Sequence, residues 1–157
     1  MIKVLFICHG NICRSPMAEY IMKNLVTQAG LEEEIEIASA ATSTEEIGND
    51  IHYGTKQILK KYHIPFGHRA ARQITKADYK KYDYLVGMDT ANIRNMHRIF
   101  GGDPDGKIYK MLAFAGINRD VADPWYTGNF EETYQDVNAG CQAMLKYCME
   151  NDKGNHK

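Results

Sequence analysis

The segment CHGNICRS, residues 8–15, concentrates side chains that could do chemistry: two cysteines, a histidine and an arginine within eight residues. A cysteine can be a nucleophile, a metal ligand, half of a disulfide or a small buried residue. An arginine can grip two oxygens of an anion with its planar fork. Arg14 follows Cys8 by six positions, and the Ser15 hydroxyl stands next to it. This combination favours the transfer of a phosphoryl group to Cys8.

The elements on either side of this segment should shape it into an anion-binding loop. Residues 2–7 (IKVLFI) read as a buried strand, and Ser15–Pro16 reads as a helix start with a capping hydroxyl and a proline in the first turn. In open α/β sheets, ligands bind beyond the carboxyl ends of the strands. Gly10 and Asn11 tolerate the unusual φ values that point successive N–H groups inward. The positive field of such a loop and of the helix N-terminus would favour a thiolate at Cys8.

Apolar periodicity predicts that strands and helices alternate along the rest of the chain. We expect further strands over 34–38, 84–88 and 107–112, and helices from Ser15 to Gly30, over 51–62, after Thr75, over 90–99 and over 130–149. Alternation of this kind predicts an α/β fold with a parallel sheet and helices on both faces. The length of 157 residues predicts one domain, residues 1–157, with a disordered tail over about 151–157.

Composition narrows the class of protein and its partners. The net charge of −1 gives no general attraction to nucleic acid or to anionic membranes, so neither is expected as a partner. No apolar run approaches the roughly 20 residues of a membrane span, and the N-terminus does not read as a signal peptide. Four cysteines are no disulfide framework, so a reducing cytoplasm is the expected location. The sequence carries no readable signal of oligomeric state, and a monomer is the expectation.

Three other interpretations of Cys8 explain the sequence less well than a nucleophile. The spacing of Cys8 and Cys13 is looser than zinc motifs usually have, and no second pair of ligands completes a site, so no metal is predicted. The loop lacks the G-K-[ST] of a nucleotide-binding P-loop. A buried structural cysteine would explain Cys8 alone, but not the joint pattern of strand, cysteine, Gly-Asn, Arg-Ser-Pro and helix.

The stretch VLFICHGNICRSPMAE resembles the signature of the low-molecular-weight protein tyrosine phosphatases. The segments SAATSTEEIGN, HRAARQITKADY, DYLVGMD and DPW follow in the order of that family, so the resemblance covers nearly the whole chain. It implies a single α/β domain with a four-stranded parallel sheet. It also implies that the chain removes phosphate from tyrosine residues of proteins and from small aryl phosphates, with no metal and no cofactor.

The resemblance also implies catalytic roles. Cys8 matches the nucleophile, Arg14 the phosphate-binding arginine, and Asp123 the general acid that afterwards acts as base on water. A phenol has a pKa near 10, so tyrosinate leaves poorly unless an acid protonates it. Cys13 matches the second loop cysteine, a redox partner that can form a disulfide with Cys8. The implied phosphate-binding loop consists of Cys8, His9, Gly10, Asn11, Ile12, Cys13, Arg14 and Ser15.

A supporting set of polar residues is implied in the same way. Asn11 would hold the strained turn of the loop, and the Ser15 hydroxyl would stabilise the thiolate and the leaving sulfur. Ser39 and His68 match the polar residues that brace Asn11. Glu19 matches the acid that pairs with that histidine.

Two departures concern the walls of the pocket. Trp125 and Tyr126 match an aromatic pair that flanks the pocket and suits a flat phenyl ring, but the animal enzymes of the family have two tyrosines after Asp-Pro. After AATS, where many members carry an aromatic wall residue, this chain has Thr44, Glu45 and Glu46. We expect a looser clamp on the ring and added negative charge at the mouth. Both departures indicate a bacterial-type member.

Three related functions remain as alternatives. Arsenate reductases that share the loop need two more cysteines after the third strand, and none lies between Cys13 and Cys141. Protein-arginine phosphatases resemble this chain with a threonine where Ile12 stands. A non-catalytic phosphotyrosine-binding module or redox sensor would need neither the thiolate nor Asp123. The sequence does not identify the physiological substrate.

Overall fold

The computed structural model describes the backbone of residues 1–155 and the side chains of residues 1–151. Its sheet has the order β2-β1-β3-β4, with every neighbouring pair parallel. The strands are β1 (Ile2–Cys8), β2 (Ile35–Ala41), β3 (Tyr84–Gly87) and β4 (Ile108–Lys110). The helices are α1 (Arg14–Gln28), α2 (Tyr53–Lys61), α3 (Lys76–Lys81), α4 (Thr90–Phe100), α5 (Pro124–Thr127) and α6 (Phe130–Asn155), with a 3-10 turn η1 (Met111–Ala115). The predicted four-stranded parallel sheet is confirmed.

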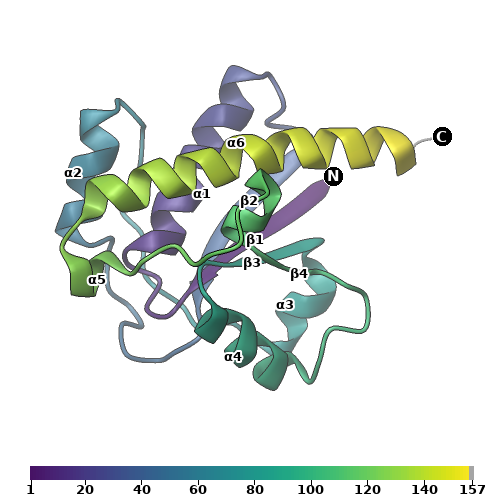
Figure 1. The fold of residues 1–157 in the computed structure, drawn as a ribbon, viewed down its shortest axis with the longest axis horizontal. Helices are drawn as coiled ribbons and strands as arrows, with labels where there is room; N and C mark the ends of the chain where they lie inside the picture. The colour runs from purple at the N-terminus through teal and green to yellow at the C-terminus, as the bar shows by residue number, and fades with distance from the viewer. Residues whose placement is uncertain (156–157) are drawn as a thin grey trace.

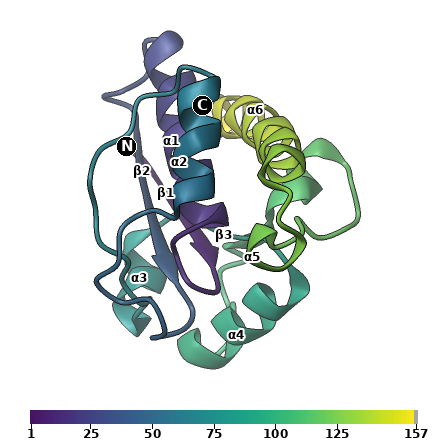
Figure 2. The ribbon, with the colours of Figure 1, turned by 90° about the vertical axis from the view of Figure 1, so that its left-hand side faces the viewer.

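Strand β1 supplies both halves of the core because its side chains alternate between the two faces of the sheet. Val4, Phe6 and Cys8 pack into the larger cluster, which includes buried residues of α1, α2 and α6. Leu5 and Ile7 pack into the smaller cluster with residues of α3 and α4. Helices therefore cover both faces, as expected (Figures 1 and 2). Cys8 is the last residue of β1, so the best-buried strand of the sheet positions it.

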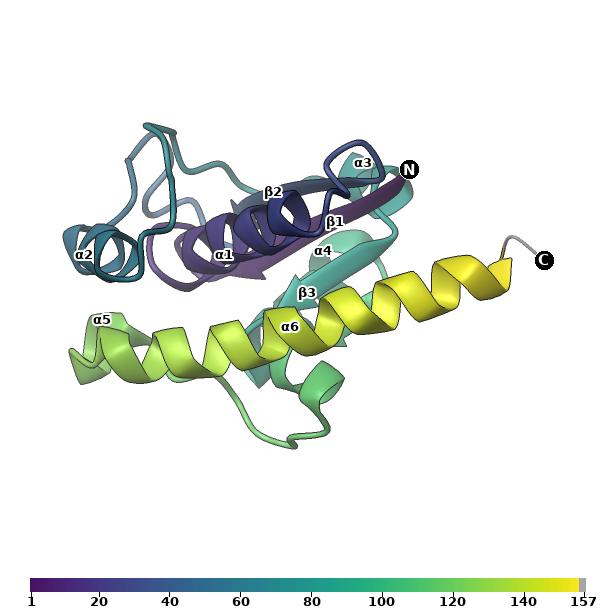
Figure 3. The ribbon, with the colours of Figure 1, turned by 90° about the horizontal axis from the view of Figure 1, so that it is seen from above.

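Helix α6 runs along one side of the molecule and packs beside α1, with α5 at its N-terminal end (Figure 3). Its start is joined to α2 by Glu131, which accepts hydrogen bonds from Lys61 Nζ and Tyr62 Oη at 2.5 Å each. The rings of Tyr62 and Tyr134 stack with their centroids 3.8 Å apart. None of the described helices is both long and apolar enough to cross a membrane.

Several boundaries differ from the predictions. Helix α6 continues to Asn155 rather than ending at Met149, since a helix already formed extends at low cost per residue. The expected disordered tail is thus helical over 151–155, and residues 156–157 lie outside the described residues. Helix α1 begins at Arg14 without a side-chain cap, because the Ser15 hydroxyl turns toward Cys8 instead. The strand expected over 107–112 ends at Lys110, where η1 takes over.

Candidate active site

The loop after β1 wraps around the Cys8 sulfur, which is almost fully buried. The N–H groups of Asn11 and Ser15 point at Cys8 Sγ from 3.3 and 3.4 Å, and Ser15 Oγ lies 3.0 Å from it. Asn11 adopts a φ of 59°, in the left-handed region that few residues other than glycine occupy. This turn aims the N–H groups inward. Donors arranged in this way favour a negative charge on the sulfur.

Arg14 stands near the end of the loop, and its guanidinium is buried. Its Nη1 donates to Asp89 Oδ2 at 2.7 Å and to the Val121 carbonyl at 2.9 Å, and its Nη2 lies 3.4 Å from Asp123 Oδ2. Burial alone would lower the pKa of Arg14, but the negative charges of Cys8 and of the two aspartates raise it overall. The guanidinium is therefore a fixed cation beside the sulfur.

Asp89 is a site residue to which the sequence analysis gave no role. It caps α4, with Oδ1 accepting from the Asn92 N–H at 2.8 Å, while Oδ2 holds Arg14. The position of Asp89 in the sequence could have indicated this role, because Asp89 follows the end of β3 by two residues and so lies at the edge of the sheet where ligands bind.

Asp123 stands at the mouth of the loop as the N-cap of the short helix α5. Its Oδ1 accepts from the Trp125 N–H at 3.0 Å, which orients the other oxygen toward Arg14. Because the α5 helix has four residues, its sequence carries no periodicity, and DP alone indicates a turn. The structure nevertheless brings Asp123 to the same pocket as Cys8 and Arg14.

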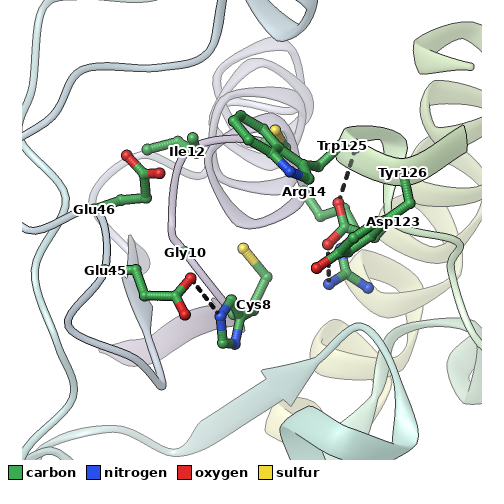
Figure 4. A pocket seen from close by; sticks show the side chains of 11 residues that line it. Cys8, Gly10, Ile12, Arg14, Glu45, Glu46, Asp123, Trp125 and Tyr126 are labelled. Atoms are coloured by element: carbon green, nitrogen blue, oxygen red, sulfur yellow. Dashed lines mark hydrogen bonds and ion pairs between the residues drawn. The ribbon is translucent and has the colours of Figure 1, made fainter. Parts of the chain in front are cut away.

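The pocket above Cys8 has two unlike walls (Figure 4). Trp125 and Tyr126 form one wall with Asp123, and both aromatic side chains are exposed to solvent. Glu45 and Glu46 line the opposite side, as the departure from the family pattern led us to expect. Within the described residues, no group of three or more His, Cys, Asp or Glu side chains could hold a metal ion.

His9, in the loop, contacts Glu45 in the acidic wall of the pocket, which Glu45 and Glu46 form. Its Nε2 lies 2.9 Å from Glu45 Oε2, and its carbonyl accepts from the N–H and the hydroxyl of Ser43 at 3.1 and 2.9 Å. The Glu45 carboxylate is thereby held near the mouth of the pocket.

The prediction that His68 braces Asn11 is wrong. The His68 side chain is 86% exposed, and its Nδ1 lies 3.0 Å from Asp50 Oδ2. Its neighbour Arg69 points inward instead and takes the bracing position. Arg69 Nη1 donates to the Asn11 carbonyl at 2.7 Å, and Nη2 donates to Asn11 Oδ1 and to Ser39 Oγ. Adjacent side chains face opposite sides here, so the residue that contacts Asn11 is one position further along the chain than predicted.

The rest of the supporting set meets at Asn11. Asn11 Nδ2 donates to Ser15 Oγ at 2.8 Å and to Ser39 Oγ at 2.9 Å. Ser39 donates in turn to Glu19 Oε1 at 2.5 Å. The expected pairing of Glu19 with His68 is wrong, because the second oxygen of Glu19 pairs with Lys23 at 2.6 Å.

Cys13 is buried in the same loop as Cys8, and both are free cysteines. Burial, followed by the negative charges of Cys8 and Asp123, raises the pKa of Cys13 to about 12. Cys13 is thus a protonated thiol near neutral pH. The disulfide with Cys8 stays a prediction.

The fold and the site together define a class. A parallel sheet whose central strand ends on a cysteine, a loop of inward N–H groups and an arginine six residues later are the parts of a cysteine-dependent phosphatase.

Comparison with known proteins places the chain within that class. A model of the family described as low molecular weight phosphotyrosine protein phosphatase matches residues 3–154. The low molecular weight protein-tyrosine-phosphatase YfkJ of Bacillus subtilis is 42% identical over 92% of this chain and 94% of its own length. Its crystal structure superposes with a TM-score of 0.93 over 96% of both chains. The phosphatase SP-PTP of Streptococcus pyogenes, 45% identical over 99% of both chains, has a TM-score of 0.86.

The chain belongs to the low molecular weight phosphotyrosine protein phosphatase family. It is a protein-tyrosine phosphatase. The family membership expected from the sequence is confirmed.

Proposed function

We propose that this chain hydrolyses phosphotyrosine and small aryl phosphates through a cysteinyl-phosphate intermediate. Cys8 is the nucleophile, Arg14 the phosphate clamp, and Asp123 the general acid and then the base. The observation that carries the proposal is the Cys8 sulfur itself, which faces two backbone N–H groups and the Ser15 hydroxyl inside a loop that Arg14 closes. A thiolate is the reactive form of cysteine, and such donors favour it.

The first step forms the S–P bond and breaks the P–O bond to the ring. The Cys8 thiolate attacks phosphorus while the loop N–H groups and Arg14 hold the three remaining oxygens. The electron pair of the breaking bond goes to the aryl oxygen, and protonated Asp123 supplies its proton. The neutral phenol then leaves past Trp125 and Tyr126.

The second step returns the enzyme to its starting state. The Asp123 carboxylate takes a proton from a water molecule, whose oxygen attacks phosphorus. The S–P bond breaks, inorganic phosphate leaves, and the electron pair remains on Cys8 as the thiolate. The Ser15 hydroxyl stabilises that leaving sulfur by donating to it. These steps need no metal or cofactor.

The proposed substrate is the phosphotyrosine side chain of a protein. The exposed faces of Trp125 and Tyr126 suit a flat phenyl ring. A monomer suffices, because every proposed catalytic group comes from one chain. We propose a cytoplasmic location because the proposed nucleophile must be a reduced thiol, which a reducing compartment would preserve.

The test compares four substrates on metal-free protein: p-nitrophenyl phosphate, a phosphotyrosine peptide, phosphoarginine and arsenate. We expect turnover of the first two. Cys8→Ser should abolish turnover while still binding phosphate or vanadate in the loop. Arg14→Lys should be nearly as damaging, because an ammonium cannot reproduce the fork. Preferred turnover of phosphoarginine, or reduction of arsenate with a thiol donor, would replace the proposal by the corresponding alternative.

A further inference from the structure

Trp125 is an exposed residue of the pocket wall, so the orientation of its ring depends on its neighbours. Its side chain is 57% exposed, and the helix α5 that carries it has only four residues. An exposed side chain changes rotamer within picoseconds to nanoseconds unless a neighbour holds it. Among the residues with described side chains, His52 supplies the one ring in contact with the indole, with centroids 5.6 Å apart and planes at 79°. Edge-to-face contacts of this geometry are favourable.

The His52 ring is itself fixed by its neighbours. Its Nδ1 accepts from the Gly54 N–H at 3.0 Å, which caps α2 and sets the rotation of the imidazole. The ring also stacks on Phe130, with centroids 5.1 Å apart and planes 16° from parallel. Phe130 can come this close to the start of α2 because a Cβ at Gly54 would lie 2.5 Å from its ring. The imidazole is therefore a fixed support for Trp125.

The backbone at the start of α2 contacts the phosphate-binding loop. The His52 N–H donates to the Ile12 carbonyl at 2.8 Å, and Thr55 Oγ1 donates to the Cys13 carbonyl at 3.1 Å. His52 thus contacts the loop through its backbone and the aromatic wall through its side chain. It connects the part of the proposed site that would hold the phosphate to the part that would hold the phenyl ring.

We propose that His52 is a positioning residue that holds the Trp125 ring in the orientation that stacks on the phenyl ring of the substrate. A side chain that is already oriented loses less freedom when the substrate binds, so His52 favours the binding of aryl phosphates. This role rests on the proposed function, in which Trp125 is a wall of the pocket. The motion of Trp125 can be measured without turnover, so this proposal and the phosphatase proposal can fail separately.

The first measurement is the time-resolved fluorescence anisotropy of Trp125, which is the only tryptophan in the chain. In the wild type, the anisotropy should decay mainly with the tumbling of the whole molecule. His52→Asn removes the ring but keeps a good capping acceptor, so α2 stays capped. The variant should add a fast component of about a nanosecond or less, because the indole regains its rotamers. An unchanged decay would overturn the proposal.

The second measurement separates binding of the ring from binding of the phosphate. In His52→Asn the KM for p-nitrophenyl phosphate should rise roughly two- to tenfold with little change in kcat, because Trp125 must be ordered equally in the ground and transition states. The inhibition constant of inorganic phosphate, which has no ring, should stay that of the wild type. An equal rise in both constants would show that the substitution disturbs the loop through Ile12, and the proposal would be wrong.

Other variants at the start of α2 separate the ring from the cap. His52→Phe keeps a ring but loses the capping acceptor, so it should retain the slow anisotropy decay while its unfolding temperature falls. A fast component as large as that of His52→Asn would assign the effect to the cap and overturn the proposal. Tyr53→Asn is the matched control, because it removes an exposed ring that does not line the pocket and should change neither measurement. His52→Ser, which also caps, replaces His52→Asn if that variant does not fold.

A double-mutant cycle tests whether His52 acts through Trp125. His52→Asn combined with Trp125→Ala should have the same KM for p-nitrophenyl phosphate as Trp125→Ala alone, since there is no indole left to orient. Additive rises in KM would show that His52 acts by another route, and they would overturn the proposal.

Discussion

At the scale of single residues, two cysteines of one loop lie in opposite environments. Cys8 faces three hydrogen-bond donors, while burial and nearby negative charge raise the pKa of Cys13 to about 12. Attack on phosphorus and oxidation both require a thiolate, and the proposed nucleophile is therefore Cys8 and not the protonated Cys13.

This asymmetry predicts the course of oxidation. Peroxide should convert Cys8 to a sulfenic acid, and Cys13 should then displace water from it to form a disulfide that dithiols reverse. In Cys13→Ser the recovery after dithiothreitol, relative to the variant's own starting activity, should be largely lost as Cys8 passes to irreversible acids. Recovery equal to that of the wild type would mean that Cys13 is not the resolving thiol. Cys141→Ser is the control, because Cys141 lies in the core beside α1.

The proposed role of Asp123 as general acid predicts how the effect of its substitution depends on the leaving group. Asp123→Ala should lower kcat on phenyl phosphate by about 10²–10⁴, the usual contribution of one acid–base group. The loss should shrink as the pKa of the leaving phenol falls, because a good leaving group needs little protonation. Steady-state rates over a series of substituted phenyl phosphates measure this. An equal loss across the series would remove Asp123 from the role.

The acidic wall predicts a change in substrate binding. Glu45→Trp would place an aromatic face opposite Trp125, and it should lower KM for p-nitrophenyl phosphate by up to about tenfold. The kcat should barely move, because the contact binds ground and transition states alike. Measurements at low and high salt separate stacking from the lost charge, which is screened over about 8–10 Å. Glu33→Trp, on an exposed turn outside the pocket, is the control. An unchanged KM in Glu45→Trp would contradict the role of this wall.

Some residues of the site could be predicted from the sequence and others could not. Cys8 and Arg14 could be predicted because their chemistry and spacing are specific, whereas Asp123 came only from the family resemblance, since Asp-Pro alone indicates a turn. The contact of Arg69 with Asn11 could not be predicted, because His68 and Arg69 are adjacent polar residues and only the path of the backbone decides which one faces Asn11.

At the scale of elements, the site is built where β1, β3 and the chain before α5 end on the same side of the sheet. The longer elements were predictable, since apolar periodicity marks β1, α1, α4 and α6. The short elements η1 and α5 were not, because their five and four residues are too few to show a helical period. Helix α5 nevertheless orients Asp123, so a functional element was among those that the pattern could not reveal.

The contact between α2 and α6 gives a prediction for stability. Lys61, Tyr62 and Gln135 donate to Glu131 and lower its pKa to about 2, from 4.5 in the unfolded chain. A carboxyl with a lowered pKa in the folded state stabilises it above about pH 4.5 and ceases to do so as the pH falls through about 2. Glu131→Gln should therefore lower the unfolding temperature by no more than about 2–4 °C near pH 6, since the group is exposed to solvent.

Thermal unfolding of both proteins between pH 2 and 7 measures this difference. It should be constant above about pH 4.5 and vanish near pH 2. Glu150→Gln, an exposed residue near the other end of α6, removes the same charge and should show no such dependence. A difference that persists unchanged at pH 2 would show that the ionised carboxylate is not its source.

At the scale of the whole molecule, the fold was predictable because several independent sequence signals favour the same architecture. Alternating strands and helices, one buried central strand and a length for one domain all favour the same parallel sheet. What the sequence could not give was the convergence of distant segments: Asp89 and Asp123 approach Arg14 across 75 and 109 positions of the chain. Both contacts depend on the topology β2-β1-β3-β4.

In the proposed mechanism the phosphoryl group passes through the Cys8 sulfur, so this intermediate can be trapped. Asp123→Ala should still be phosphorylated by p-nitrophenyl phosphate, whose leaving group needs little acid, but should hydrolyse the intermediate slowly without its base. After an acid quench, intact-mass and peptide mass spectrometry should find one phosphoryl group on Cys8 in Asp123→Ala and none in Cys8→Ser/Asp123→Ala. A phosphoryl group on another residue, or none at all while p-nitrophenol is released, would contradict the account.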